Sequence, residues 1–175
     1  VGLTDAQGVR LAVEGAAAVD NAVAIGQVAL TPRPGDFPNA MQVNFGNKVE
    51  LVGYDMSPRA IRPGEAVTVT LYWRSRAAFE ADYAVFLNAI RPNLRKSAED
   101  TGKPLNGHFS TQGWPVGQVI TDVRVLQFPP TARAGLLDVE VGWFLPGGDR
   151  LPVLAADGHE VDTKQLLSKM RVRDE

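Results

Sequence analysis

The fold is indicated most clearly by the stretch Val67-Thr68-Val69-Thr70-Leu71-Tyr72-Trp73-Arg74. Every second residue from Val67 to Trp73 is apolar, and the residues between them are two threonines and a tyrosine. Successive side chains of a β-strand point to opposite faces, so this period of two predicts a strand with one buried face and one wetter face. The preceding segment Arg62-Pro63-Gly64-Glu65 predicts a turn, because proline fixes φ and glycine accepts a positive φ.

The stretch Leu137 to Trp143 repeats this alternation. Its odd-numbered residues are apolar and are expected to face inward, whereas Asp138 and Glu140 are expected to lie on a solvated outer face. The stretch Val49 to Met56 is apolar on both parities, which predicts a strand in the centre of a sheet.

Further short strands are predicted between glycine- and proline-rich turns, at 23–30, 83–90, 119–128, 150–154 and 166–172. Helical patterns are scarce. The sequence therefore predicts an all-β chain folded as an antiparallel two-sheet β-sandwich, immunoglobulin-like or jelly-roll-like, with about eight to ten strands and little helix.

Composition excludes several kinds of function. The 175-residue chain is 45% apolar with a formal net charge of −2, which gives no electrostatic reason to expect nucleic acid or an anionic membrane surface as a partner. It has no cysteine, which excludes disulfides, thiolate zinc sites and cysteine nucleophiles. No apolar run approaches the ~20 residues of a spanning helix, so we expect no direct membrane insertion by this fragment. No cofactor is predicted.

The two ends of the chain share a pattern. Residues 1–13 match residues 141–153 at constant spacing, and residues 20–30 match residues 162–172 in the same way. We interpret residues 1–31 as tail strands of a preceding repeat packed on the main unit, residues 32–42 as a linker, and residues 43–175 as the sandwich. The expected partners are then the rest of a longer parent polypeptide, including a neighbouring repeat.

The longest stretch without a strand pattern runs from Arg91 to Gly117, and long loops at sandwich edges often bind ligands. An aromatic ring can stack on a pyranose while amides and carboxylates hold its hydroxyls. This composition predicts a glycan-binding site at Asp100, Asn106, His108, Phe109, Gln112 and Trp114. Two structural alternatives stay open, in which Trp114 is tucked beneath the loop and His108 is an ordinary surface residue.

Catalytic patterns are weak. Two carboxylates could serve a glycosidase, but the candidates Asp100, Asp122, Asp138, Asp149 and Asp162 show no diagnostic spacing. The sequence lacks a phosphate-binding glycine loop, G-x-S-x-G, H-E-x-x-H and EF-hand spacing. We therefore predict no catalytic residue and no metal ligand, and keep a glycoside-active enzyme only as a third hypothesis.

Residues 41–173 also carry a set of turn and core motifs: Asn44-Phe45-Gly46, Leu51-Val52-Gly53-Tyr54-Asp55, Arg62-Pro63-Gly64-Glu65, Leu71-Tyr72-Trp73, Asp82-Tyr83-Ala84-Val85-Phe86, Trp114-Pro115-Val116-Gly117, Asp122, Pro129-Pro130, Val141-Gly142 and Arg150-Leu151-Pro152-Val153. As a set they resemble a β-sandwich module that follows the membrane part of bacterial mannosyltransferase-like, polyprenyl-phosphate-sugar-using glycosyltransferases. The chain departs from that pattern at Leu87-Asn88-Ala89-Ile90, where a histidine-containing strand end is common, and again over Arg91 to Lys96.

The resemblance implies an extracytoplasmic location as part of a membrane-anchored parent, and no catalytic residues to carry over. The expected function is a non-catalytic accessory domain that presents a glycan acceptor or supports the parent. The alternative is an independent carbohydrate-binding module that uses the loop 91–117.

Overall fold

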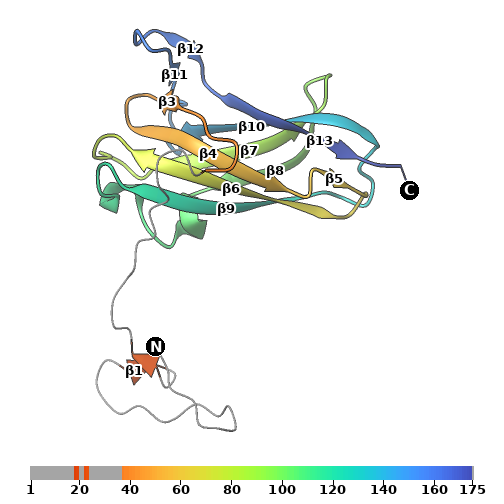
Figure 1. Cartoon of the computed structure of the whole chain (residues 1–175), viewed down its shortest axis with the longest axis horizontal. Coiled ribbons are helices and arrows are strands. Elements are labelled where there is room, and N and C mark those ends of the chain that lie inside the picture. Colours follow the sequence, from red (N-terminus) through yellow and green to blue (C-terminus); the bar gives the residue numbers. More distant parts are fainter. Residues whose placement is uncertain (1–17, 20–21, 24–36, 175) are drawn as a thin grey trace. The chain divides into compact units, whose positions relative to one another are not determined.

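The structure is a computed structural model, and it describes residues 18–19, 22–23 and 37–174 (Figure 1). The chain divides into two compact units, Val1–Leu30 and Thr31–Glu175. In the first unit, β1 (Ala18–Val19) pairs with β2 (Ala22–Val23) in antiparallel fashion. The other residues of the predicted tail strands, and residues 32–36 of the predicted linker, lie outside the described residues. The repeat and its packing on the main unit therefore stay predictions.

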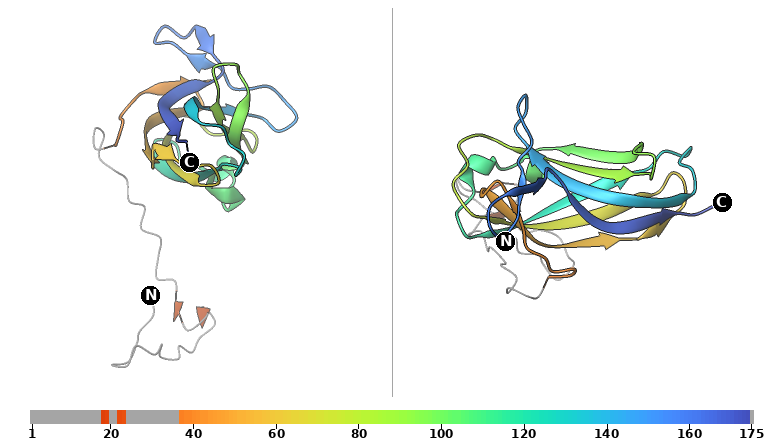
Figure 2. Two further views of the ribbon diagram at one scale, coloured as in Figure 1. Left: turned by 90° about the vertical axis from the view of Figure 1, so that its right-hand side faces the viewer. Right: turned by 90° about the horizontal axis from the view of Figure 1, so that it is seen from above.

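The second unit is a two-sheet β-sandwich (Figures 1 and 2). One sheet has five strands in the order β5 (Ala60–Ile61), β13 (Gln165–Val172), β10 (Gly135–Phe144), β7 (Ala84–Ile90) and β8 (Lys96–Gly102). The other has six, in the order β12 (Glu160–Asp162), β11 (Val153–Leu154), β3 (Val43–Phe45), β4 (Val49–Ser57), β6 (Ala66–Ser75) and β9 (Val119–Gln127). Between β8 and β9 lie two short 3-10 helices, η1 (Pro104–Gly107) and η2 (Thr111–Gly113).

This architecture confirms the predicted all-β fold of two sheets. Within the sandwich the strand pairs are antiparallel, except that β13 runs parallel to β5. Among the described residues no helix is long and apolar enough to span a membrane.

The core lies between β6 of one sheet and β10 of the other. The inward-facing residues predicted for these strands are all buried, from Val67 to Trp73 and from Leu137 to Trp143. Trp73 and Trp143 meet edge to face across the two sheets, with ring centroids 5.0 Å apart and an interplanar angle of 77°. Aromatic rings prefer this arrangement, because the positive edge of one ring faces the negative face of the other.

The predicted turn and centre strand are confirmed. The Glu65 amide donates to the Arg62 carbonyl at 3.2 Å, and Gly64 adopts a φ of +87° that few other residues tolerate. The strand β4 lies between β3 and β6. This central position was predicted from the apolar residues on both of its faces.

The prediction that Glu140 lies on a solvated face was wrong. Glu140 is buried, and its carboxylate accepts a hydrogen bond from Asn88 Nδ2 at 3.0 Å. The cause is the position of β10, which has hydrogen-bonded neighbours on both sides, so that side chains of β7 and β13 flank Glu140. Asp138 is closer to the expectation, since it is partly exposed and pairs with Lys169 at 2.8 Å.

Candidate functional site

The segment from Arg91 to Gly117 is more ordered than its sequence predicted. Residues 96–102 form β8, a strand at the edge of the five-stranded sheet. This strand escaped prediction because Lys-Ser-Ala-Glu-Asp-Thr-Gly has almost no apolar alternation, and its pairing with β7 alone defines it. The irregular part shrinks to residues 103–118, which cross from β8 to β9 at the open edge of the sandwich.

A buried ion cluster closes that edge. The Arg124 side chain is 4% exposed, and its Nε donates to Asp122 Oδ2 at 2.8 Å. The same guanidinium donates from Nη1 to Asp100 Oδ1 and from Nη2 to the Gly102 carbonyl, both at 3.0 Å. It therefore joins β9 of one sheet to β8 of the other.

The two carboxylates of this cluster also hold backbone amides. Asp122 Oδ1 accepts from the Leu105 amide at 2.8 Å, and Asp100 Oδ2 accepts from the Val125 amide at 3.1 Å. Asp122 is itself almost fully buried. The predicted ligand residue Asp100 thus has a structural task, which leaves less of its carboxylate free for a ligand.

A second network holds the loop at Thr111, which is fully buried. The Thr111 amide donates to Asp82 Oδ1 at 3.0 Å, and its hydroxyl accepts from the Tyr83 amide at 2.9 Å. Lys103 Nζ lies 2.7 Å from Asp82 Oδ2. The hydrogen bond from Lys103, followed by that from Thr111, holds the pKa of Asp82 below its ordinary 3.8 against the desolvation that raises it. Nearby, hydrogen bonding from Lys48 lowers the pKa of Glu80 to about 2.

These lowered pKa values predict that acid loosens the loop. A carboxylate whose folded pKa lies below its unfolded value stabilises the fold above the unfolded value, and that contribution is lost as the pH falls through the folded pKa. We therefore expect the hydrogen-exchange protection of the Thr111 amide to fall between about pH 5 and about pH 2 relative to core amides of β6. In Asp82→Asn, which keeps the acceptor oxygen without the charge, protection should be lower and nearly independent of pH over that range. Unchanged protection in the native chain at about pH 2 would contradict this assignment.

Trp114 lies in the core rather than on the surface. It is 3% exposed, and its ring meets that of Trp143 at a centroid distance of 5.7 Å and that of Phe79 at 5.8 Å. Trp114 therefore has no exposed ring face on which a sugar could stack, as its predicted role requires. The structural alternative, a tryptophan tucked beneath its loop, describes the observed position.

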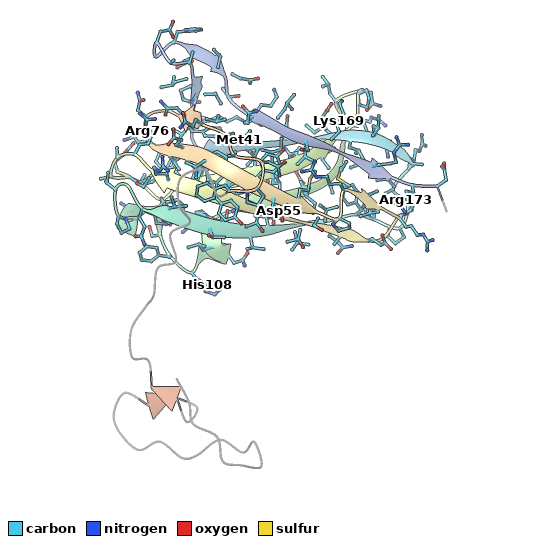
Figure 3. All side chains as sticks on the ribbon, viewed as in Figure 1. Met41, Asp55, Arg76, His108, Lys169 and Arg173 are labelled. Carbon is cyan, nitrogen blue, oxygen red and sulfur yellow. The ribbon has the colours of Figure 1, made fainter. Side chains whose placement is uncertain are left out.

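The other predicted site residues are on the surface. Asn106 and His108 are exposed, and Figure 3 shows His108 at the outer edge of the loop. Phe109 is 45% exposed and has its ring against Gly113. Gln112 is also exposed, and its side-chain amide donates to the Glu80 carbonyl at 3.2 Å.

Two predicted residues meet in one surface hollow, which we call the loop hollow. It has a volume of about 370 Å³ and is lined by Asp100, Thr101, Gly102, Lys103, Asn106, Gly107 and Arg124. It is open to solvent, and its lining offers an amide, a hydroxyl, a carboxylate and an ammonium group as possible ligand contacts. Among the described residues no group of three or more His, Cys, Asp or Glu side chains could hold a metal ion.

Arg124 was missed by the sequence reasoning, because the alternation in β9 does not show which of its faces is buried. In β9 the residues Asp122 and Arg124 have the same parity as the apolar residues Ile120 and Leu126, but the other parity carries Val119, Val123 and Val125, and of these Val123 and Val125 are exposed. The usable signal was two opposite charges two residues apart in one strand, because such side chains point to the same face and can be buried as a pair although neither charge could be buried alone.

No protein-family model and no curated protein matches the chain. Among solved structures it is similar to the Pseudomonas fluorescens alkylpurine DNA glycosylase AlkC bound to DNA containing an abasic site analogue, with a TM-score of 0.42 and 15% identity. That match covers 74% of this chain and 31% of the glycosylase chain. It is also similar to AvmM, which catalyses macrocyclisation in alchivemycin A biosynthesis, with a TM-score of 0.37, 13% identity and coverage of 79% and 97%. Likeness at this level says nothing about the activity of this chain.

Proposed function

We propose that the sandwich is a non-catalytic accessory domain of a larger, extracytoplasmic, membrane-associated glycosyltransferase-like protein, in which it presents a glycan acceptor or supports the catalytic part. The parent and its location rest on the sequence resemblance over residues 41–173. The non-catalytic role is supported by the structural use of the loop carboxylates.

The main support for a non-catalytic role is that the loop carboxylates are already bonded to cations and backbone amides. Asp100 and Asp122 share the buried Arg124, and Asp82 is bonded to Lys103 and to the Thr111 amide. Glycoside hydrolysis needs one carboxyl group that holds a proton to protonate the leaving group. Both oxygens of each of these three carboxylates already accept hydrogen bonds from an arginine, a lysine or a backbone amide, so the three groups are suited to fixing the loop.

A second candidate function, an independent carbohydrate-binding module, is favoured by the loop hollow. Asn106 and Lys103 offer donors and Asp100 and Thr101 offer acceptors there, which suits the hydroxyl groups of a sugar. With the Trp114 ring buried, the strongest stacking platform is missing from this site, and we expect the binding to be weak.

Saturation-transfer NMR of the chain with neutral mono- and oligosaccharides tests both functions. We expect weak binding that leaves the sugar chemically unchanged and that is lost in Asn106→Ala. The exposed Thr121 on the outer parity of β9 provides a control, since Thr121→Ala should leave the binding unaltered. Release of a reducing sugar would overturn the non-catalytic assignment, whereas an absence of binding would leave the supporting role and remove glycan presentation by this hollow.

A further inference from the structure

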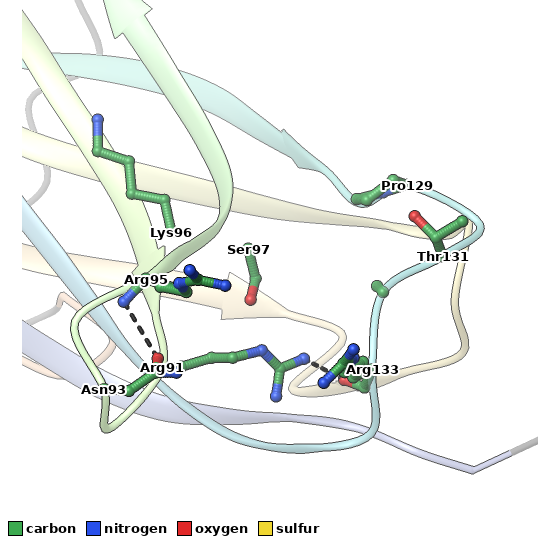
Figure 4. Close-up of a pocket in the computed structure, with 9 residues that line it drawn as sticks. Arg91, Asn93, Arg95, Lys96, Ser97, Pro129, Thr131 and Arg133 are labelled. Carbon is green, nitrogen blue, oxygen red and sulfur yellow. Dashed lines mark hydrogen bonds between the residues drawn. The ribbon is translucent and has the colours of Figure 1, made fainter.

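A second hollow, which we call the arginine groove, lies between two turns that are far apart in the sequence. It is formed by the β7–β8 turn and the loop that leads from β9 to β10, and it has a volume of about 280 Å³ (Figure 4). Its lining includes the arginines Arg91, Arg95 and Arg133 and the hydroxyl-bearing residues Ser97 and Thr131. Among its lining residues there is no aspartate or glutamate.

The groove is held in shape by hydrogen bonds within and between the two turns. In the β7–β8 turn the Arg91 amide donates to the Arg95 carbonyl at 3.0 Å, and the Leu94 amide donates to the Arg91 carbonyl at 2.8 Å. The Arg91 guanidinium reaches across to the other loop, where it donates to the carbonyls of Arg133 and Ala134. A site that is ordered before the ligand binds loses less conformational entropy on binding, so its affinity is higher.

The positive charge of the groove is largely uncompensated. Within the described part of the chain, no carboxylate forms an ion pair with Arg91, Arg95 or Arg133. Lys96 also lines the groove, but its ammonium pairs with Glu99 at 2.5 Å, and in Figure 4 its side chain points away from the arginines. Arg91 uses two of the five N–H donors of a guanidinium on the two carbonyls and keeps the others available.

From this arrangement we infer that the arginine groove binds a phosphate or pyrophosphate group. Three guanidinium groups around a hollow of this size match an anion that carries more than one charge and several acceptor oxygens. A single carboxylate would leave most of the positive charge unbalanced. The hydroxyls of Ser97 and Thr131 supply further donors to phosphate oxygens.

Leu94, at the tip of the β7–β8 turn, indicates a source for that phosphate group. Leu94 is 84% exposed and has a φ of +63°, a conformation that is unfavourable for leucine. It therefore presents an apolar side chain to solvent directly beside Arg95. This combination suits a lipid headgroup, because arginines contact the phosphate while an apolar side chain enters the interface.

The inference is independent of the proposed glycan function, since the two hollows have different linings. It is tested by titrating the chain with inorganic pyrophosphate in NMR experiments. In parallel, the chain is sedimented with vesicles of phosphatidylcholine alone or of phosphatidylcholine mixed with phosphatidylglycerol. We expect saturable pyrophosphate binding that Arg95→Gln and Arg133→Gln each weaken about tenfold. Arg62→Gln removes an exposed arginine that does not line the groove, and it should change the affinity by less than about twofold.

The vesicle measurement distinguishes the two sources of phosphate. Binding to the anionic vesicles that Leu94→Ser reduces, with pyrophosphate binding unchanged, identifies a lipid headgroup. Pyrophosphate binding without vesicle binding identifies a soluble phosphate compound. If neither probe binds, or if the double variant Arg95→Gln/Arg133→Gln binds as well as the native chain, the inference is wrong.

Discussion

Replacing Trp143 with alanine is expected to lower the free energy of unfolding by about 3–5 kcal/mol. Trp143 is completely buried, and its ring lies 5.0 Å from that of Trp73, 5.7 Å from that of Trp114 and 6.0 Å from that of Phe79, measured between centroids. The substitution leaves a cavity where the two sheets and the loop 103–118 meet, and tight packing on all sides limits how far the surroundings can collapse into it. Urea unfolding followed by far-ultraviolet circular dichroism measures the loss.

Two matched variants show whether the effect belongs to this position. Val125 lies on the outer parity of β9 and is 47% exposed, so Val125→Ala should change the stability by less than about 0.5 kcal/mol. Trp143→Phe should cost less than Trp143→Ala, because it keeps most of the ring volume and removes an indole N–H that has no hydrogen-bond partner. Equal losses for Trp143→Ala and Val125→Ala would mean that the core does not lie where the structure places it.

The strands with a clear period of two were predictable from the sequence. In β6 and β10 the apolar parity faces the opposite sheet, and burial of that face decides the register whatever the neighbours are. The strand β8 could not be found in this way. It is a polar edge strand defined by its pairing with β7, from Val85 opposite Gly102 to Ile90 opposite Lys96, and a pairing of this kind leaves no trace in local composition.

The buried ion pair and the arginine groove also differ in how far the sequence could predict them. The buried pair Asp122 and Arg124 lies within one strand, so the sequence shows that the two side chains share a face, whereas the packing of the sheets decides that this face is buried. The arginine groove joins residues 91–97 to residues 129–133, and only the strand order β10, β7, β8 places these two segments at one end of the sandwich. A net charge of −2 describes the whole chain and conceals such a local excess of positive charge.

The substitution Arg124→Met is expected to cost about 3–5 kcal/mol, because it leaves the buried carboxylate of Asp122 and the partly buried carboxylate of Asp100 without their cation. Methionine is similar in length and fills most of the vacated volume, so the loss reports mainly on uncompensated charge. For comparison, Lys96→Met removes the exposed pair with Glu99 and should cost less than about 1 kcal/mol. If the two variants lose the same stability, Arg124 is not the buried link between the sheets.

A double substitution separates the charge effect from simple loss of packing. In the native chain the Leu105 amide donates a hydrogen bond to Asp122 Oδ1 at 2.8 Å. The substitution Asp122→Asn keeps an oxygen that can accept this bond and removes the negative charge. We therefore expect Arg124→Met/Asp122→Asn to be more stable than Arg124→Met by about 1–3 kcal/mol, although Asp122→Asn alone destabilises the native chain. The coupling should also appear as restored hydrogen-exchange protection at Leu105, because that amide begins the loop that the cluster holds. If the double variant is less stable than Arg124→Met, the two residues act independently, and the edge of the sandwich is closed by packing alone.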